Sequence, residues 1–209
     1  SLEYIENADG RLESRERNAE FAVEFQNADR VAGYYTNSFE FFPVPSRIGA
    51  VLLPVGGYAF DTFRLQYNMG QQRPMAANFS VEYGTFYNGH KTTFNAQRGR
   101  IVLTNQLSVE PVYSINRVRL NEGRFTQHLA GSRVTFTVTP LMFVTALMQY
   151  NSSANAVSTN ARLRWEYQPG SELFVVYNEE RDTLVRRFPG VMNRGLTVKV
   201  NRLLRFCCC

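Results

Sequence analysis

The chain has 209 residues, carries a net charge of +5, and is 44% hydrophobic and 13% aromatic. Its mean hydropathy is −0.29, and no apolar run reaches the roughly 20 residues that a membrane-spanning helix needs, which excludes a helical membrane protein. The 16 Phe and 11 Tyr can bury more surface than a disordered chain does. No amphipathic helical stretch occurs, which argues against a soluble α/β enzyme. The class that remains is an all-β protein, and the transmembrane β-barrel fits in particular, because its strands are apolar only at every second residue.

Arginine supplies almost all of the positive charge, since only Lys91 and Lys199 are lysines. The arginines are scattered singly, and no basic run or RNA-binding aromatic motif occurs, so we expect no nucleic-acid partner. The three cysteines stand together at residues 207–209, with no upstream cysteine to pair with and no histidine at metal-ligand spacing. We expect residues 1–206 to form one barrel domain, Cys207–Cys209 to be an appended tail, and no cofactor to be bound.

Apolar and polar residues alternate with period 2 along most of the chain, which predicts β-strands. Between residues 160 and 168, for example, the odd-numbered residues are apolar or aromatic and the even-numbered ones are polar or charged. The pattern predicts about twelve antiparallel strands joined by consecutive hairpins. These are 2–7, 11–27, 29–42, 57–69, 72–87, 90–103, 106–120, 125–139, 141–151, 155–168, 171–179 and 193–206.

The predicted connections fall into two sets. Tight turns such as 27–29 and 104–105 lie at one end of the strands. The connections at the other end are more varied and include the two longest loops, 43–56 and 180–193. Outer-membrane barrels show this arrangement, with short periplasmic turns and longer extracellular loops. A simple up-and-down order of about twelve strands also needs closure to remove its two edges. The sequence therefore predicts an antiparallel up-and-down transmembrane β-barrel in the bacterial outer membrane.

The end of the last predicted strand sets the orientation. Phe206 closes that strand, and a final strand that ends in an aromatic residue resembles the C-terminal signal read by the barrel-assembly machinery. We expect Phe206 to point outward at the inner interface, with Tyr67 and Tyr167 in an aromatic girdle near the same rim. The tight turns would then be periplasmic.

Several segments carry a family resemblance: PLMF at 140–143, QYNSS at 149–153, RLRWEYQPGSELFVVYNE at 162–179, YIENADG at 4–10, PVGGY at 54–58 and GTFY at 84–87. Together they resemble a bacterial family of outer-membrane β-barrel proteins of unknown function. Its full-length members resemble secreted hydrolase-like proteins with an N-terminal module similar to the family-nine carbohydrate-binding module. The resemblance implies that this chain is the C-terminal part of a longer parent, with the parent's strand count left open. It implies an exported barrel of uncertain activity, with carbohydrate binding in a module that this chain lacks. From the alternation, the loop sorting and the Phe206 end, we expect a membrane anchor, or a pore or translocation channel, for the upstream module.

Twelve polar residues fall on the faces opposite the apolar ones and would face the lumen: Glu20, Glu24, Arg64, Gln66, Glu82, Glu110, Arg133, Gln149, Arg162, Arg164, Glu166 and Lys199. Arg and Glu paired across neighbouring strands would stabilise the barrel and set its solute selectivity. A plugged lumen and a conducting pore both stay open, because this strand number lies between filled and channel-forming sizes. The expected partners are outer-membrane lipid and lipopolysaccharide, the barrel-assembly machinery, and a glycan or small solute.

Catalysis has little support in the sequence. His90 lies in a predicted hairpin turn, whereas His128 precedes Ser132 and could serve it as a base. Both His128 and Ser132 share the apolar face, and no orienting carboxylate is evident. The charged segment 179–187 could bind a divalent cation or lipopolysaccharide phosphates, although such clusters are more often internally paired. We assign no catalytic or metal residue, and keep a soluble all-β carbohydrate-binding domain and a barrel-embedded hydrolase as alternatives.

Overall fold

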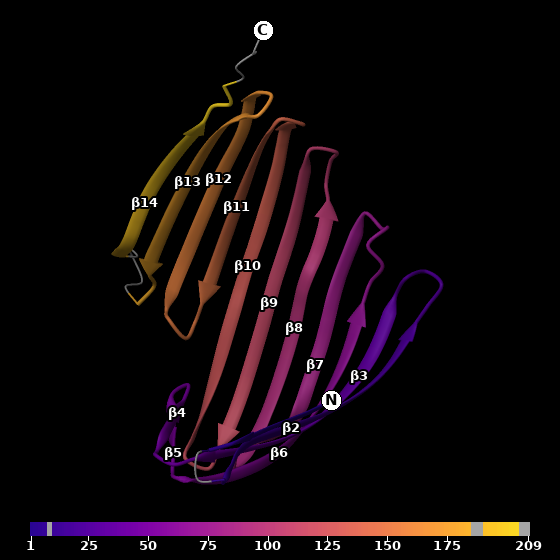
Figure 1. The fold of residues 1–209 in the computed structure, drawn as a ribbon, viewed down its shortest axis with the longest axis vertical. Helices are drawn as coiled ribbons and strands as arrows, with labels where there is room; N and C mark the ends of the chain where they lie inside the picture. The colour runs from indigo at the N-terminus through magenta and orange to yellow at the C-terminus, as the bar shows by residue number, and fades with distance from the viewer. Residues whose placement is uncertain (8–9, 185–189, 205–209) are drawn as a thin grey trace. The chain divides into compact units, whose positions relative to one another are not determined.

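The computed structural model describes residues 1–7, 10–184 and 190–204. These ranges contain fourteen β-strands and no helix. Twelve of the strands form one sheet whose order follows the chain from β1 to β14, with β4 and β5 left out (Figure 1). The all-β class and the order of consecutive hairpins are thus confirmed. No helix in the described ranges is long and apolar enough to cross a membrane.

The strands of the large sheet alternate apolar and polar residues, and Val, Thr, Phe and Tyr recur in them because branched and aromatic side chains pack well on a pleated surface. They are β1 (Leu2–Glu6), β2 (Leu12–Glu24), β3 (Arg30–Phe42), β6 (Gly56–Asn68), β7 (Met75–Phe86), β8 (Gly89–Val102), β9 (Leu107–Leu120), β10 (Gly123–Thr139), β11 (Met142–Asn151), β12 (Ala156–Gln168), β13 (Ser171–Asp182) and β14 (Gly190–Asn201).

The predicted loop 43–56 contains structure that the sequence reading missed. β4 (Ser46–Ile48) and β5 (Val51–Leu53) pair as a separate two-stranded sheet. Gly49 turns the chain between them with a φ of +59°, a conformation that favours glycine. Val51 and Leu53 pack with Val118 and Leu120 of β9 in a small apolar cluster. The sequence predicted a loop here without this hairpin, because three-residue strands are too short to show a period.

The predicted loop 180–193 is also shorter than expected. β13 continues to Asp182 and β14 begins at Gly190, and Glu180 pairs with Asn193 in the register of the two strands. The connections at the end that carries the β4–β5 hairpin vary in length, and two of them, 87–88 and 121–122, contain two residues each.

The chain divides into two compact units, one of residues 1–98 and 113–128 and the other of residues 99–112 and 129–209. One sheet contains strands of both units, so the division does not decide whether residues 1–206 form one domain. The single domain stays a prediction.

In the first unit, the register assigns the side chains of β2, β3, β6 and β7 to two faces, because antiparallel partners point to the same side of a sheet. One row consists of Glu20, Tyr34, Arg64 and Glu82. The adjacent row, on the opposite side, consists of Phe21, Gly33, Leu65 and Val81. We call the side with Glu20 the polar face and the side with Phe21 the apolar face.

The second unit has the same two kinds of face on β11 to β14. Its polar face includes the row Gln149, Ser158, Glu180 and Asn193. Its apolar face includes the row Val144, Leu163, Val175 and Val198.

Large apolar side chains are exposed on the apolar face of each unit. Phe21 is 76% exposed in the first unit and Leu196 is 67% exposed in the second. Other exposed members are Phe63, Leu65, Val81, Tyr83, Phe136, Met148, Trp165, Val198 and Val200. A soluble β-sandwich buries such faces against each other in a shared core, so these exposed faces need another explanation.

Candidate functional site

The register places the predicted polar residues within each unit. Glu20, Glu24, Arg64, Gln66 and Glu82 lie on the polar face of the first unit. Glu110, Arg133, Gln149, Arg162, Arg164, Glu166 and Lys199 lie on the polar face of the second unit. That these faces line a lumen stays a prediction.

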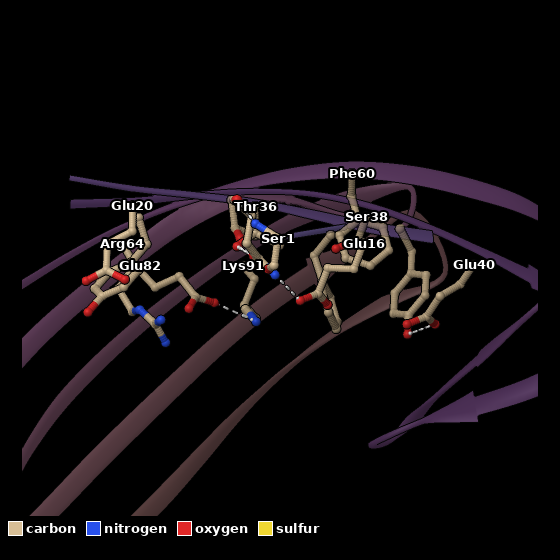
Figure 2. Close-up of a pocket in the computed structure, with 15 residues that line it drawn as sticks. Ser1, Glu16, Glu20, Thr36, Ser38, Glu40, Phe60, Arg64, Glu82 and Lys91 are labelled. Atoms are coloured by element: carbon tan, nitrogen blue, oxygen red, sulfur yellow. Dashed lines mark hydrogen bonds and ion pairs between the residues drawn. The ribbon is translucent and has the colours of Figure 1, made fainter. Parts of the chain in front are cut away.

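The polar face of the first unit forms a cavity of about 680 Å³. Figure 2 shows side chains from several strands converging on it. Its lining consists of Ser1, Glu16, Asn18, Glu20, Tyr34, Thr36, Ser38, Glu40, Phe60, Thr62, Arg64, Glu82, Phe86, Tyr87 and Lys91. Hydroxyl, amide and charged groups outnumber apolar ones, so the cavity suits water and polar solutes.

A row of alternating charges crosses this cavity. The guanidinium of Arg64 lies 4.4 Å from the centre of the Tyr34 ring, which is cation–π distance. The Nζ of Lys91 lies 2.7 Å from Oε1 of Glu82, and both side chains are about one-fifth exposed. Cross-strand pairing of this kind holds neighbouring strands in register.

Two carboxylates of the cavity form no ion pair within the described ranges. Glu16 accepts a hydrogen bond of 2.6 Å from Asn18, and Glu40 accepts one of 2.8 Å from the Tyr87 hydroxyl. Burial, together with Glu40, raises the pKa of Tyr87, which lies in the turn after β7. Glu20, by contrast, pairs with Arg30. The two unpaired glutamates give this part of the polar face an acidic character.

The polar face of the second unit carries its own ion pairs. Arg133 lies 3.9 Å from Glu110, and Arg164 pairs with Glu172. A smaller cavity of about 210 Å³ is lined by Arg133, Thr145, Leu147, Asn160 and Arg162. The alternation in the sequence assigned these residues to one face, but it did not predict which of them pair with each other.

The two tyrosines of the predicted girdle both make hydrogen bonds near a turn. The Tyr67 hydroxyl donates to Oδ2 of Asp29 at 2.9 Å, and the Tyr167 hydroxyl donates to the backbone oxygen of Asn201 at 3.1 Å. The predicted assembly signal Phe206 and the tail Cys207–Cys209 lie outside the described residues.

Asp29 is a residue that sequence reasoning missed. It is 5% exposed and lies in the turn between β2 and β3. Besides Tyr67, its carboxylate accepts hydrogen bonds from the Gly70 backbone at 2.8 Å and from Arg73 at 3.0 Å. The Gly70 N–H, followed by Tyr67 and Arg73, holds the pKa of Asp29 below its ordinary value. Asp29 thereby joins the β2–β3 turn to the β6–β7 turn.

The geometry separates the candidate catalytic residues. His128 and Ser132 are four residues apart in β10, so their Cα atoms lie about 13 Å apart along the strand. That distance is too long for a nucleophile and its base. The Nδ1 of His128 instead lies 3.2 Å from the Tyr113 hydroxyl, and the His90 ring stacks on Tyr83.

The charged segment after Tyr177 is internally paired where the structure describes it. Glu179 pairs with Arg181, and its Oε2 lies 2.7 Å from the Arg194 guanidinium. The rest of the predicted cluster, from Val185 to Arg187, lies outside the described residues. Among those that are described, no three His, Cys, Asp or Glu side chains form a potential metal site.

Compared with protein-family models, curated proteins and solved structures, the chain matches none. The resemblance to a bacterial outer-membrane family therefore stays a prediction.

Proposed function

We propose that this chain is a membrane-spanning β-barrel wall of the bacterial outer membrane, acting as an anchor or a pore for an upstream module. The observation that carries the proposal is the contrast between the two faces of the sheet. In each unit the apolar face exposes large side chains, whereas the polar face holds ion pairs and cavities. A lipid bilayer outside and water inside would satisfy both faces at once.

The strand lengths fit a membrane crossing. A transmembrane β-strand needs about 9–11 residues when it is tilted. The strands from β2 to β14 in the large sheet have 10 to 17 residues. Each of these strands is therefore long enough for its membrane-facing side chains to span the hydrocarbon layer.

Aromatic residues border the apolar band of the first unit, as they do in outer-membrane barrels. One bordering row includes Tyr35, Phe63 and Tyr83. The row beyond it on the same face becomes polar, with Asn37 paired to Asp61. Tyr67, four residues further along β6, donates its hydroxyl to the Asp29 turn. An aromatic row followed by a polar row is the expected order at a membrane–water interface.

Closure of the barrel would solve a second problem. In the described sheet β1 and β14 are the edge strands, and open edges in lipid leave backbone groups without hydrogen bonds. Barrel-assembly machinery would be the partner that closes such an edge, and lipid and lipopolysaccharide would surround the product.

Trp165 provides the experiment, because it is the only tryptophan of the chain and lies 43% exposed on the apolar face. Its row also contains Met142, Leu173 and Val200. In vesicles that contain brominated lipid, we expect strong quenching of Trp165 fluorescence, with the Trp165→Phe variant defining the background. A chain that is folded and monomeric in buffer without detergent, and unquenched by these vesicles, would refute the proposal.

Conductance across planar bilayers then separates the two roles. Discrete channel openings would assign a pore for small solutes, and a silent but inserted chain would assign an anchor with a filled interior.

The second candidate is a soluble carbohydrate-binding domain, and one observation favours it. Trp165 and Tyr167 form an edge-to-face pair with ring centres 6.1 Å apart, and aromatic rings of this kind can bind sugars. Trp165 fluorescence also tests this second candidate. In a soluble carbohydrate-binding domain, glycans would change the fluorescence of Trp165, and brominated lipid would not.

A further inference from the structure

Three exposed arginines lie on the apolar face of the first unit, at the end that carries the β4–β5 hairpin. Arg117 and Arg119 alternate along β9 with Val118 and Leu120, which are buried in the apolar cluster on the other side. The Thr93 hydroxyl donates a hydrogen bond of 2.7 Å to the Asn116 side-chain oxygen. Thr93 lies two residues from Lys91 in β8, so both it and Asn116 lie on the polar face. Arg117 and Arg119 therefore point outward.

The third arginine, Arg124, follows the turn that joins β9 to β10. Its neighbour Phe125 packs against the cluster of Val118 and Leu120, so Phe125 lies on the polar face of the sheet. Because neighbouring residues in a strand point to opposite faces, Arg124 points outward as well. None of the three arginines forms an ion pair in the described part of the chain, whereas Arg30 and Lys91 on the polar face are paired.

A hollow of about 520 Å³ lies beside Arg119. His90, Thr85 and the amides of Asn88 and Asn121 also line it. The nearest carboxylate along the chain, Glu122, is held by the Asn88 amide at 2.7 and 2.8 Å rather than by an arginine. The hollow thus presents hydrogen-bond donors and positive charge toward the outside.

We propose that Arg117, Arg119 and Arg124, together with His90, bind the phosphate groups of a phosphorylated glycolipid in the surrounding membrane. The position favours this ligand, because His90 stacks on Tyr83, which borders the apolar band, with ring planes 3° apart. Lipid headgroups lie at that level, next to the aromatic border. Guanidinium groups bind phosphate through paired, charge-assisted hydrogen bonds. The inference rests on the proposed function, since it needs lipid around this face.

The test is a binding titration of the refolded chain in detergent micelles with a fluorescent bis-phosphorylated lipid A-type glycolipid. We expect the triple variant Arg117→Gln/Arg119→Gln/Arg124→Gln to bind it about tenfold or more weakly than the parent chain. The matched control, Arg11→Gln/Arg47→Gln/Arg100→Gln, removes the same charge from positions outside this patch and should bind within about twofold. The dephosphorylated glycolipid should bind the parent chain as weakly as the phosphorylated form binds the triple variant.

Equal affinities of the two triple variants would overturn the proposal, and so would displacement of the glycolipid by inorganic phosphate at equal concentration, which would indicate a free-phosphate site. Quenching of Trp165 by brominated lipid, measured on every variant, keeps the two proposals apart. If quenching persists while the triple variant binds normally, only the phosphate site fails; if quenching is lost in the parent chain, the membrane assignment fails.

Discussion

Among single residues, Asp29 joins two turns of this sheet through three long-range polar contacts. Its partners Tyr67, Gly70 and Arg73 lie 38 to 44 residues away along the chain. A buried carboxylate is stable only when donors replace the water it has lost. Here a backbone amide, a phenol and a guanidinium do so, which holds two turns of the first unit together.

The ionisation of Asp29 predicts a pH dependence of stability. Because its folded pKa lies below the ordinary value of 3.8, its ionised form favours the folded state, fully so above that value. This contribution is lost as the pH falls through the lowered folded pKa. We expect Asp29→Asn to lower the urea midpoint at pH 7, and the gap from the parent chain to shrink as the pH falls below about 4. A gap of equal size at pH 7 and pH 3 would contradict this role.

Among the elements, the β4–β5 hairpin lies in the segment 43–56 that the sequence predicted to be a loop. Leu53 is fully buried, whereas Leu52 next to it is 60% exposed. The hairpin therefore holds to β9 by one face only. Its apolar contacts with Val118 and Leu120 close the polar face at this end of the first unit.

The two leucines allow a matched prediction for the hairpin. Leu53→Ala should remove about 3 kcal/mol of local stability by leaving a cavity, and Leu52→Ala should change it by less than about 0.5 kcal/mol. The exposed Arg47 in β4 provides a trypsin site that reports on opening of the hairpin. Cleavage there should accelerate in Leu53→Ala and stay at the parent rate in Leu52→Ala. Equal cleavage rates in the two variants would show that the packed face does not hold the hairpin.

At the scale of the whole molecule, the two faces of the sheet require opposite environments. Leu65 and Gln66 are neighbours in β6 and point to opposite faces. Leu65 is 52% exposed, so in a water-soluble protein an arginine at this position would be tolerated.

In a membrane the same substitution should be harmful. We expect Leu65→Arg to cost about 2–4 kcal/mol in folding from urea into lipid vesicles if Leu65 lies near the bilayer midplane. Gln66→Arg, which adds the same side chain on the polar face, should fold at nearly the parent yield. Tolerance of Leu65→Arg, measured by the vesicle-inserted and protease-resistant fraction, would argue for the soluble alternative.

The amino-acid sequence alone was enough to predict the twelve strands of the large sheet and the sides on which their residues fall. A period of two is a local property, since each residue points opposite to its neighbour whatever lies beside the strand. The runs 160–168 and 75–84 therefore identified their faces without knowledge of their partners. The consecutive order of hairpins followed as well, because short connections leave neighbouring strands side by side.

Only the tertiary structure decided the contacts between distant residues. Lys91 pairs with Glu82, Arg133 with Glu110, and Asp29 with Tyr67, because the register of separate strands and turns brings them together. The β4–β5 hairpin likewise depends on a surface supplied by β9 some 65 residues later. The net charge and mean hydropathy average over two faces, and the register is what separates an exposed apolar face from a charged one.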